Sequence, residues 1–394
     1  MDCTEAIFGR LTDLYRNRLG RKGLVALHEP WFVGKERDYV GDCIDSGWVS
    51  SVGPYVDRFE AELSRVTGAK FAVATVNGTS ALHVGLHALG VTVDDLVVCP
   101  ALSFVATANA IAYCGAEPVF LDVDPGDLGL SPVNLERFFL DECMADGGCL
   151  RHRETGRRVA AVLAVHLFGH PAQIEDIAEL CDTWRIPLVE DAAEALGSLF
   201  RGRACGTFGC AGILSFNGNK TLTTGGGGAI LIDNEDFARR LKHLTSTART
   251  VHGWQTDHDV VGFNYRMPNI NAALGCAQLE HLADFIRRKR TLADLVRDWI
   301  LPLDDVVMLR EPANAYSNYW LNGIFLADRE QRDTILALCN ESGIQARACW
   351  RPLPELPMFR RCKVAATGIA VAQDYAARLL NIPSSPNLIG HDVL

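Results

Sequence analysis

The sequence lacks an excess of positive charge, and this absence bears on its possible partners. It has 38 Lys and Arg residues against 48 Asp and Glu residues, which gives a formal net charge of −10. A negatively charged protein repels polyphosphate backbones at long range, although a small phosphorylated ligand needs only a few local donors. We therefore expect no nucleic-acid partner.

Long apolar segments are also missing. No run approaches the roughly twenty apolar residues that cross a bilayer. The start of the chain, Met1-Asp2-Cys3-Thr4-Glu5, has no basic residues followed by an apolar stretch, as a secretion signal would have. We expect a cytoplasmic protein that does not insert into a membrane.

Metal-binding spacings are absent as well. There are 13 cysteines, an odd number, but no Cys-x-x-Cys, and Cys205 and Cys210 have no matching pair of histidines. Other cysteines follow apolar residues, as Cys99 and Cys114 do. This pattern is typical of reduced thiols in a core, and we expect no metal.

The size and composition that are present favour a globular protein with two domains. At 394 residues the chain exceeds the length at which one core keeps growing, and it is 48% hydrophobic and only 22% charged. We expect a large domain over residues 1–285 and a smaller α+β domain over residues 286–394.

From residue 71 onward, short β-branched runs alternate with helical patterns, which predicts an α/β fold. Apolar strands between helices imply a mostly parallel sheet with helices on both faces, and ligands bind such sheets at the carboxyl ends of the strands. The strands are expected at Phe71 to Val76, Leu96 to Cys99, Pro118 to Val123, Val159 to Val165, Pro187 to Asp191, Gly212 to Phe216 and Ala229 to Asp233.

Three further segments carry structural predictions. The irregular stretch from Leu140 to Arg158 is interpreted as a surface hairpin or loop, and one long helix is expected to run from about Ile270 through Arg290. The basic cluster Arg287-Arg288-Lys289-Arg290 could attract anions, but a solvated helix face is the favoured interpretation.

Lys220 and Asp191 together indicate a pyridoxal phosphate site. Lys220 ends the run Ser215-Phe216-Asn217-Gly218-Asn219-Lys220, and Asp191 ends an apolar strand about thirty residues earlier. A lysine can form a Schiff base with the cofactor aldehyde, and a buried aspartate can hold the protonated ring nitrogen. A carboxylate at that depth would otherwise need a salt-bridge partner, which is the alternative interpretation of Asp191.

The other demands of this cofactor also have candidates. Gly78, Thr79 and Ser80 open a predicted helix, where free backbone N–H groups and hydroxyls can bind a phosphate, and Ser215 could add another hydroxyl. Phe104 follows the second strand and could stack on the ring, although an isolated phenylalanine is more often a core residue. The four glycines from 225 to 228 are interpreted as close backbone packing beneath the lysine.

With these motifs in view, the chain resembles the DegT/StrS nucleotide-sugar aminotransferases, which have the pyridoxal phosphate-dependent transferase type I fold, as aspartate aminotransferase does. The resemblance extends over nearly the whole chain. Its motifs are Gly47-Trp48-Val49-Ser50-Ser51-Val52-Gly53, Val189-Glu190-Asp191-Ala192-Ala193-Glu194 and Gly262-Phe263-Asn264-Tyr265-Arg266-Met267. Ser-Phe-Asn-Gly-Asn-Lys with its glycine tail looks most like the legionaminic-acid branch.

The resemblance implies a role for each matching position. Lys220 matches the Schiff-base lysine, Asp191 the pyridinium partner and Phe104 the stacking aromatic residue. Asn264 matches an asparagine that reaches the phosphate in the neighbouring subunit, so a homodimer is implied. The remaining implied contacts are Thr79, Ser80 and Ser215 for the phosphate, Ser50, Ser51 and Gly53 for the nucleotide sugar, and Arg347 and Trp350 as further substrate candidates.

Glu194 departs from the commonest family pattern, because many members carry Gln or His there, near the phenolic oxygen of the cofactor. A carboxylate facing a phenolate would be repelled. Glu194 is therefore expected to be protonated or paired with a cation.

The resemblance implies transfer of an amino group from L-glutamate, through pyridoxamine phosphate, to the C4 ketone of a nucleotide-linked 4-keto-6-deoxy sugar. A UDP-N-acetyl sugar is the first choice of substrate, and a 4-amino-4,6-dideoxy sugar is the product. Two alternatives stay open at this point. One is a sugar dehydratase, although related dehydratases replace the lysine with histidine, and the other is a cofactor-binding sensor without turnover.

Overall fold

The computed structural model describes residues 3–252, 254–303 and 306–390, and its centre is a mixed β-sheet of ten strands within that part of the chain. The strand order is β1-β11-β10-β7-β6-β2-β3-β18, and the hairpin β4–β5 joins through β6. The strands are β1 (Phe71–Thr75), β2 (Asp95–Pro100), β3 (Glu117–Leu121), β4 (Cys143–Asp146), β5 (Cys149–His152), β6 (Arg158–Val165), β7 (Leu188–Asp191), β10 (Ala211–Ser215), β11 (Gly228–Ile232) and β18 (Lys363–Val364).

The strand directions bring several carboxyl ends to one edge. β10, β7, β6, β2, β3 and β18 pair in parallel, whereas β11 is antiparallel to both β1 and β10. β1 therefore runs in the same direction as β10 and β7. The loops that follow β1, β7 and β10 consequently leave the sheet at the same edge.

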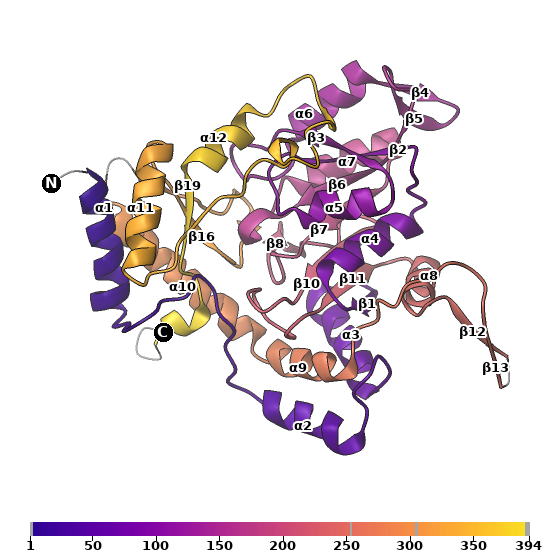
Figure 1. Ribbon diagram of the computed structural model, residues 1–394, viewed down its shortest axis with the longest axis horizontal. Helices are drawn as coiled ribbons and strands as arrows, with labels where there is room; N and C mark the ends of the chain where they lie inside the picture. Colours follow the sequence, from indigo (N-terminus) through magenta and orange to yellow (C-terminus); the bar gives the residue numbers. More distant parts are fainter. Residues whose placement is uncertain (1–2, 253, 304–305, 391–394) are drawn as a thin grey trace.

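Helices cover both faces of this sheet, as the sequence predicted (Figure 1). Every residue of β2 is buried, which matches its continuous apolar run, because a parallel strand between two helical layers has no solvent face. One face packs against α4 (Gly78–Ala88), α5 (Ala106–Tyr113) and α8 (Glu235–Thr245). The other packs against α3 (Pro54–Thr67), α6 (Pro132–Arg137), α7 (Ile174–Trp184) and α9 (Asn269–Leu279).

A second, four-stranded antiparallel sheet forms most of the C-terminal part, with the order β14-β16-β19-β17. Its apolar face packs on helices at the left of Figure 1. These strands are β14 (Val307–Met308), β16 (Asn322–Phe325), β17 (Arg347–Ala348) and β19 (Leu379–Ile382), and the helices are α1 (Cys3–Thr12), α10 (Leu282–Ile300) and α11 (Arg329–Glu341). The helix α12 (Ala370–Arg378) leads into β19.

The boundary near residue 285 stays a prediction. The N-terminal helix α1 packs against α11, and Ile7 and Leu11 share a buried cluster with the C-terminal sheet. In the opposite sense, β18 extends the large sheet by pairing with β3. Each of the two parts thus receives an element from the other side of the expected boundary.

Small elements complete the chain. The helix α2 (Glu36–Ser46) packs against α9, below the large sheet in Figure 1. The hairpin β12 (Arg249–His252) and β13 (Gln255–His258) extends away from the body at the lower right. A three-stranded sheet of β8 (Leu199–Phe200), β9 (Arg203–Ala204) and β15 (Ala315–Tyr316) ties the large sheet to the C-terminal part. The segment from 140 to 158 contains the β4–β5 hairpin, as predicted.

Two predictions on the C-terminal helices are wrong. The expected long helix is two helices, α9 and α10, with a break at Glu280 and His281. The basic cluster is not a uniformly solvated face, because Lys289 is fully buried and donates hydrogen bonds to the carbonyls of Trp320 at 3.1 Å and Ser384 at 2.7 Å. Burial lowers the pKa of the Lys289 amine well below its ordinary value.

The cysteines are free thiols, and eight of the thirteen are buried: Cys43, Cys99, Cys143, Cys181, Cys205, Cys276, Cys339 and Cys349. The described segments hold no cluster of three or more His, Cys, Asp or Glu side chains placed to bind a metal. No helix within them has the length and apolar character needed to cross a membrane.

Candidate active site

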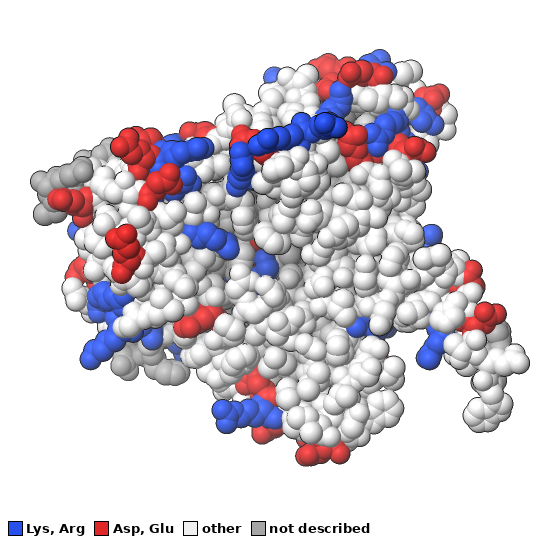
Figure 2. Space-filling model, in the orientation of Figure 1, with Lys and Arg blue, Asp and Glu red and all other residues white. Residues whose placement is uncertain are grey.

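A cavity of about 300 Å³ opens at the edge where β1, β7 and β10 end. Figure 2 shows a hollow near the middle of this face, between the C-terminal part and the large sheet. The predicted site residues that line the cavity are Gly78, Thr79, Phe104, Asp191, Glu194, Ser215, Lys220, Arg347 and Trp350.

The loop after β10 holds Lys220. Its first turn closes with a 3.0 Å bond from the Lys220 N–H to the carbonyl of Asn217, and Phe216 and Gly227 are joined by a 2.8 Å backbone bond. Gly225 has a φ of +77°, and added Cβ atoms at Gly227 and Gly228 would collide with neighbouring atoms. The glycine run therefore does allow the close packing that the sequence predicted.

The Lys220 amine lies between a carboxylate and an aromatic ring. Its Nζ donates to Glu194 Oε1 at 3.1 Å and lies 3.8 Å from the centre of the Trp320 ring. The two side chains of the ion pair are 12% and 5% exposed. Glu194 thus has the cationic partner that its position required, and this part of the sequence prediction holds for the protein without cofactor.

Glu194 uses both carboxylate oxygens. Oε1 faces Lys220, and Oε2 accepts a 2.8 Å bond from the backbone N–H of Phe168. Burial raises the pKa of the Glu194 carboxyl, against the lowering effect of the Lys220 charge. The carboxylate therefore depends on Lys220 to remain ionised.

Asp191 lies at the floor of the cavity, 6% exposed at the end of β7. Its Oδ2 accepts from the Thr107 hydroxyl at 2.9 Å, and its Oδ1 accepts from the Ala193 N–H at 3.2 Å. Burial raises the pKa of this carboxyl above its ordinary value, against the hydrogen bond from Thr107. Its anion would be stabilised further by a cationic partner in the cavity.

Behind Asp191 lies a buried pair that the sequence reasoning missed. His166 Nε2 is 3.0 Å from Glu190 Oε2, and both side chains are fully buried. Because His166 Nδ1 accepts the Ala172 N–H at 3.1 Å, the ring proton is on Nε2 and is donated to Glu190. The backbone N–H of His166 also donates a hydrogen bond to the backbone carbonyl of Asp191 at 3.1 Å, so the buried pair of His166 and Glu190 helps to fix the end of β7. The sequence feature that could have revealed this pair is His166 itself, a polar residue directly after the apolar strand β6.

The N-terminus of α4 faces the other end of the cavity. Asn77 caps this helix by accepting the Ser80 N–H at 2.7 Å. Gly78 packs so closely on Ser215 that an added Cβ would lie 3.0 Å from the Ser215 Cβ. The free N–H groups and the hydroxyls of Thr79 and Ser215 can bind an anion there. Ser80 does not line the cavity, and its N–H is already used by the cap.

Aromatic side chains form one wall. Phe104 is 50% exposed, and its ring centre lies 5.9 Å from that of Trp350, which in turn stacks on Phe168 at 5.1 Å and 21°. An exposed phenylalanine in a cavity is not a core residue, so this alternative interpretation of Phe104 is wrong.

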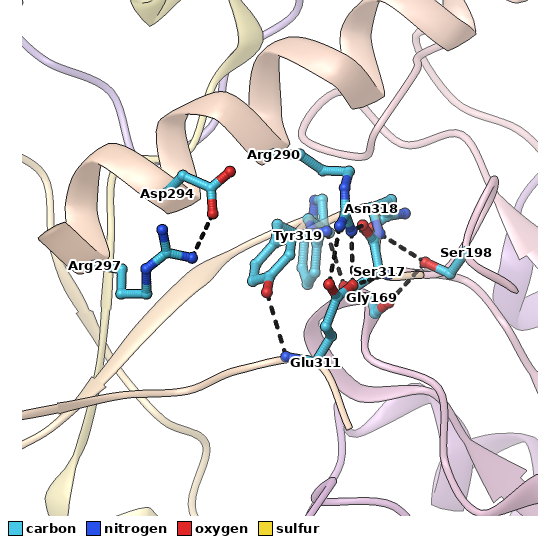
Figure 3. A network of polar contacts seen from close by, with 10 residues as sticks. Gly169, Ser198, Arg290, Asp294, Arg297, Glu311, Ser317, Asn318 and Tyr319 are labelled. Atoms are coloured by element: carbon cyan, nitrogen blue, oxygen red, sulfur yellow. Dashed lines mark hydrogen bonds and ion pairs between the residues drawn. The ribbon is translucent and has the colours of Figure 1, made fainter. Parts of the chain in front are cut away.

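The loop between β15 and β16, part of which is shown in Figure 3, contacts both the segment next to this wall, at Gly169, and the Lys220 loop, at Thr221. Asn318 is fully buried, and its Nδ2 lies within hydrogen-bonding distance of Glu194 O at 2.8 Å, Leu196 O at 3.0 Å and Thr221 Oγ1 at 3.1 Å. Its Oδ1 accepts the Trp320 N–H at 2.7 Å. No local pattern points to Asn318, because the distant partners of its side chain lie in two other segments, at Glu194 and Leu196 and at Thr221.

Other contacts in Figure 3 anchor the same loop. The Ser317 hydroxyl donates to the Gly169 carbonyl at 2.8 Å, as Ser198 does at 2.7 Å. Arg290 forms a 2.6 Å ion pair with Glu311, and Glu311 accepts the Ser317 N–H at 2.7 Å. The loop is thereby tied to both α10 and the large sheet.

Four predicted residues lie away from Lys220 in the single chain. Ser51, Gly53 and Asn264 line a separate cavity of about 410 Å³. Ser50 lines neither cavity, and its carbonyl accepts the Asn269 N–H at 2.6 Å. None of the four lines the cavity around Lys220 in the single chain, and their contacts with the cofactor phosphate or the sugar stay predictions.

The residues of the main cavity suit pyridoxal phosphate. A helix N-terminus with hydroxyls faces one end, a buried carboxyl lies on the floor, an exposed phenyl ring stands at the side, and the Lys220 amine projects between them. These groups meet the needs of a phosphate, a pyridine nitrogen, a ring face and an aldehyde.

Comparison with known proteins gives an independent result. A model of the DegT/DnrJ/EryC1/StrS aminotransferase family matches residues 32–394. The chain is 35% identical over 370 residues to the GDP-perosamine synthase of Escherichia coli O157:H7, which covers 94% of this chain and 96% of that relative. It is 37% identical over 369 residues to EpsN of Bacillus subtilis strain 168, with 92% of each chain covered.

A solved structure with a similar fold is the aminotransferase TlmJ of Streptoalloteichus hindustanus. It matches with a TM-score of 0.84 and 29% identity, over 94% of this chain and 96% of TlmJ. The expected type I transferase fold is thereby confirmed.

Proposed function

Because the chain belongs to the DegT/DnrJ/EryC1/StrS aminotransferase family and is a pyridoxal phosphate-dependent enzyme, we propose that it aminates the C4 ketone of a nucleotide-linked 4-keto-6-deoxy sugar. L-Glutamate is the proposed donor, and a 4-amino-4,6-dideoxy sugar is the product. The observation that carries this proposal is one cavity with Lys220, Asp191, Phe104 and the N-terminus of α4 around it.

When bound, pyridoxal phosphate supplies an aldehyde that exchanges amines and a ring that withdraws electrons. Lys220 is the amine that holds this aldehyde in the resting enzyme and becomes free when a substrate amine replaces it. The free Nζ is then the base that moves a proton from the α-carbon of the donor, and later returns one to C4 of the sugar.

The other residues bind and orient. Asp191 would accept a hydrogen bond from the protonated ring nitrogen, and Thr107 and Ala193 keep its carboxylate in place through bonds of 2.9 and 3.2 Å. Gly78, Thr79 and Ser215 bind the phosphate, and Phe104 covers one face of the ring. Glu194 holds the Lys220 amine in position through the 3.1 Å ion pair.

The nucleotide is the open part of the proposal. The sequence motifs favoured a UDP-N-acetyl sugar and the legionaminic-acid branch, whereas two relatives are a GDP-perosamine synthase and EpsN. The shared chemistry is a 4-keto-6-deoxy sugar on a nucleoside diphosphate. We keep the UDP-linked 2-acetamido sugar as the first substrate to test and the GDP-linked sugar as its competitor.

A homodimer is part of the proposal. Ser51, Gly53 and Asn264 line a cavity other than that of Lys220 in one chain, which supports a role for them at the site of a neighbouring subunit. In that arrangement Asn264 contacts the phosphate bound by the partner. The proposed location is cytoplasmic, where nucleotide sugars and glutamate are available.

The dehydratase alternative has no support from the cavity, because Lys220 is present and lies next to Glu194. A lysine returns readily to the cofactor aldehyde, which ends a dehydration cycle early.

Lys220→Ala should abolish the reaction. The purified variant is expected to lose the cofactor absorbance at about 420 nm that a lysine-bound aldehyde gives, and to show no turnover with L-glutamate and a keto-sugar. Lys242→Ala is the control, since Lys242 forms a partly exposed ion pair with Glu60. Sustained turnover in Lys220→Ala would contradict the proposal.

The substrate is identified with the pyridoxamine phosphate form of the enzyme. This form is mixed separately with UDP-, GDP- and dTDP-linked 4-keto-6-deoxy sugars. The sugar that restores the absorbance of the lysine-bound aldehyde is the acceptor. If none of them restores it while L-glutamate still converts the cofactor, the enzyme is an aminotransferase with a different acceptor.

A further inference from the structure

Two buried hydroxyl groups lie where the chain passes from β2 into α5. Ser103 and Thr107 are 1% and 0% exposed, and their hydroxyl oxygens are 2.8 Å apart. Phe104, which lies between them in the chain, lines the cavity, as Ser103 does. Because the Thr107 N–H donates to the Phe104 carbonyl at 3.2 Å, one turn of the chain positions the phenyl ring and both hydroxyls.

The Thr107 hydroxyl connects this turn to the floor of the cavity. Its oxygen lies 2.9 Å from Asp191 Oδ2, so consecutive hydrogen bonds join Ser103, Thr107 and Asp191. We call the first two the hydroxyl pair. Thr107 is the second residue of α5, so the N-terminal turn of this helix lies next to the carboxyl. The positive end of a helix dipole favours an anion in that position.

The chemistry of a hydroxyl fixes the direction of these hydrogen bonds. A threonine hydroxyl has one hydrogen, and an ionised carboxylate can only accept. When Asp191 is ionised, the Thr107 hydrogen therefore points to Oδ2, and the hydrogen between the two hydroxyls comes from Ser103. The order of donation is then from Ser103 to Thr107 and from Thr107 to Asp191.

Asp191 needs this donor because its other surroundings act in opposite senses. Burial raises the pKa of its carboxyl, and the hydrogen bond from Thr107 is the strongest influence that lowers it. The titratable groups that also face Asp191 are Lys220 and His166, which favour the anion, and Glu194, which opposes it. Lys220 and His166 already pair with other carboxylates, whereas the Thr107 hydroxyl donates to Asp191 alone.

The carboxylate keeps the capacity to bind one more group. Each carboxylate oxygen can accept about two hydrogen bonds. Oδ2 of Asp191 accepts from Thr107, and Oδ1 accepts the Ala193 N–H at 3.2 Å, so both oxygens have capacity left. Asp191 lines the cavity, and a protonated ring nitrogen there would meet an anion that is already held from two sides.

We propose that Ser103 and Thr107 are positioning residues, which hold Asp191 as an anion and thereby keep the proton on the ring nitrogen of the cofactor. This inference rests on the role of Asp191 in the proposed function. Without the Thr107 donor, the carboxyl would compete with the ring nitrogen for their common proton, and a neutral ring withdraws electrons less strongly. The hydroxyl pair acts through Asp191 rather than on the substrate.

The experiment compares Thr107→Val with Thr107→Ser in the holoenzyme, loaded with pyridoxal phosphate that carries ¹⁵N in its ring. Valine keeps the shape of the side chain and removes the hydroxyl, whereas serine keeps the hydroxyl. The ¹⁵N chemical shift at neutral pH reports whether the ring nitrogen holds a proton. It should move towards the value of the neutral ring in Thr107→Val and stay near the wild-type value in Thr107→Ser.

Thr67→Val is the matched control. Thr67 is also buried, and its hydroxyl donates to the Leu63 carbonyl at 2.7 Å, on α3, which does not line the cavity. The ¹⁵N shift in this variant should coincide with that of the wild type. Ser103→Ala should change the shift in the same direction as Thr107→Val, but less, because Thr107 keeps its own hydrogen and loses only the polarising donor.

Conversion of the cofactor by L-glutamate gives a second readout. The rate at saturating L-glutamate should fall about tenfold in Thr107→Val, as expected for the loss of a hydrogen bond to a charged group. The L-glutamate concentration that gives half of this rate should stay unchanged, since no contact with the donor is removed. If only that concentration changes, Thr107 acts on the amino donor and the inference is wrong.

The outcomes separate this inference from the proposed function. If the ring nitrogen is protonated in the wild type and equally so in Thr107→Val, the hydroxyl pair is structural and the inference is wrong. If the wild-type ring nitrogen holds no proton, the role of Asp191 in the proposed function fails instead. Neither readout uses a sugar, so the identity of the acceptor does not affect them.

Ser103→Ala keeps the inference testable if Thr107→Val does not fold. This variant removes one hydroxyl at the wall of the cavity and leaves the bond between Thr107 and Asp191 in place. An unchanged ¹⁵N shift in Ser103→Ala would contradict the proposed role of the hydroxyl pair.

Discussion

At the scale of single residues, the pair of Lys220 and Glu194 governs the protonation of the site. The two side chains are nearly buried, 3.1 Å apart, and each is the nearest opposite charge that the other has. Burial raises the pKa of Glu194, so its carboxylate and the Lys220 ammonium stabilise each other. Without the Lys220 charge, burial would raise the pKa of Glu194 further.

Glu194→Gln tests this coupling. The glutamine keeps the shape of the side chain but removes the negative charge next to the Lys220 nitrogen, so the protonated form of that nitrogen loses stabilisation. The pH midpoint of the cofactor absorbance should therefore move to lower pH, by about one unit. The measurement is an absorbance titration of the holoenzyme between pH 6 and 9.

The matched control is Glu175→Gln, since Glu175 forms an exposed ion pair with Arg201 far from the cofactor cavity. Its titration should coincide with that of the wild type. An unchanged midpoint in Glu194→Gln would mean that Glu194 acts only on the loop around Phe168, whose N–H it accepts.

At the scale of elements, the site depends on a loop that carries no reacting group. The segment between β15 and β16 places Asn318 against the ends of the Glu194 and Lys220 loops, and places Trp320 next to the lysine. The Trp320 Nε1 donates to the Asn219 carbonyl at 2.6 Å, which closes the connection. The position of Lys220 is therefore set from the C-terminal part of the chain.

Asn318→Leu should loosen this connection. It keeps the volume of the side chain but leaves the Glu194 and Leu196 carbonyls without their donor in a fully buried place. The free energy of unfolding in urea should fall by about 3 kcal/mol, and the cofactor should dissociate more readily.

Asn340→Leu provides the comparison. The Asn340 amide also donates to two carbonyls, at 2.8 and 3.1 Å, but it is exposed, so water can replace it. Its loss of stability should be about 0.5 kcal/mol or less. If the two substitutions lower the free energy of unfolding equally, the burial of the Asn318 hydrogen bonds does not add to their contribution to stability.

At the scale of the whole molecule, exposed apolar side chains gather on the two segments that flank the second cavity. Trp48, Val49 and Val52 precede α3, and Val251, Trp254, Val260 and Val261 are on and after the β12–β13 hairpin. Figure 2 shows few charged side chains over the part of this face where α3, α4 and α9 lie. A large apolar surface of this kind is typical of a subunit interface.

Mixed dimers test the proposed sharing of residues. Lys220→Ala and Asn264→Ala should each be inactive or nearly so as homodimers. After unfolding and refolding together, about one quarter of the wild-type activity should return, because half of the dimers are mixed and each has one intact site.

Subunit exchange is checked separately with a tagged copy that is pulled down with its partner. If exchange occurs and no activity returns, Asn264 serves the site of its own chain and the proposed sharing is wrong.

Much of the fold could be predicted because its signals are local. The strand β2 is a continuous apolar run, and Asn77 before Gly78 is a cap that needs only its own turn. Lys220 and Asp191 could be identified because Asp191 ends a strand of the predicted sheet and Lys220 lies in the loop five residues after the end of another. The break between α9 and α10 and the burial of Lys289 were missed, since both depend on how this region packs against the C-terminal sheet.

The sequence by itself determined the alternation of strands and helices, the lysine and aspartate, and the glycines beneath them, because propensity, periodicity and turn chemistry act over a few residues. Only the tertiary structure decided that Glu194 pairs with Lys220, that Asn318 ties three loops together, and that the Thr107 hydroxyl reaches Asp191. These contacts join segments from 26 to more than 120 residues apart in the chain. Their formation depends on the packing of the two sheets, which no local pattern specifies.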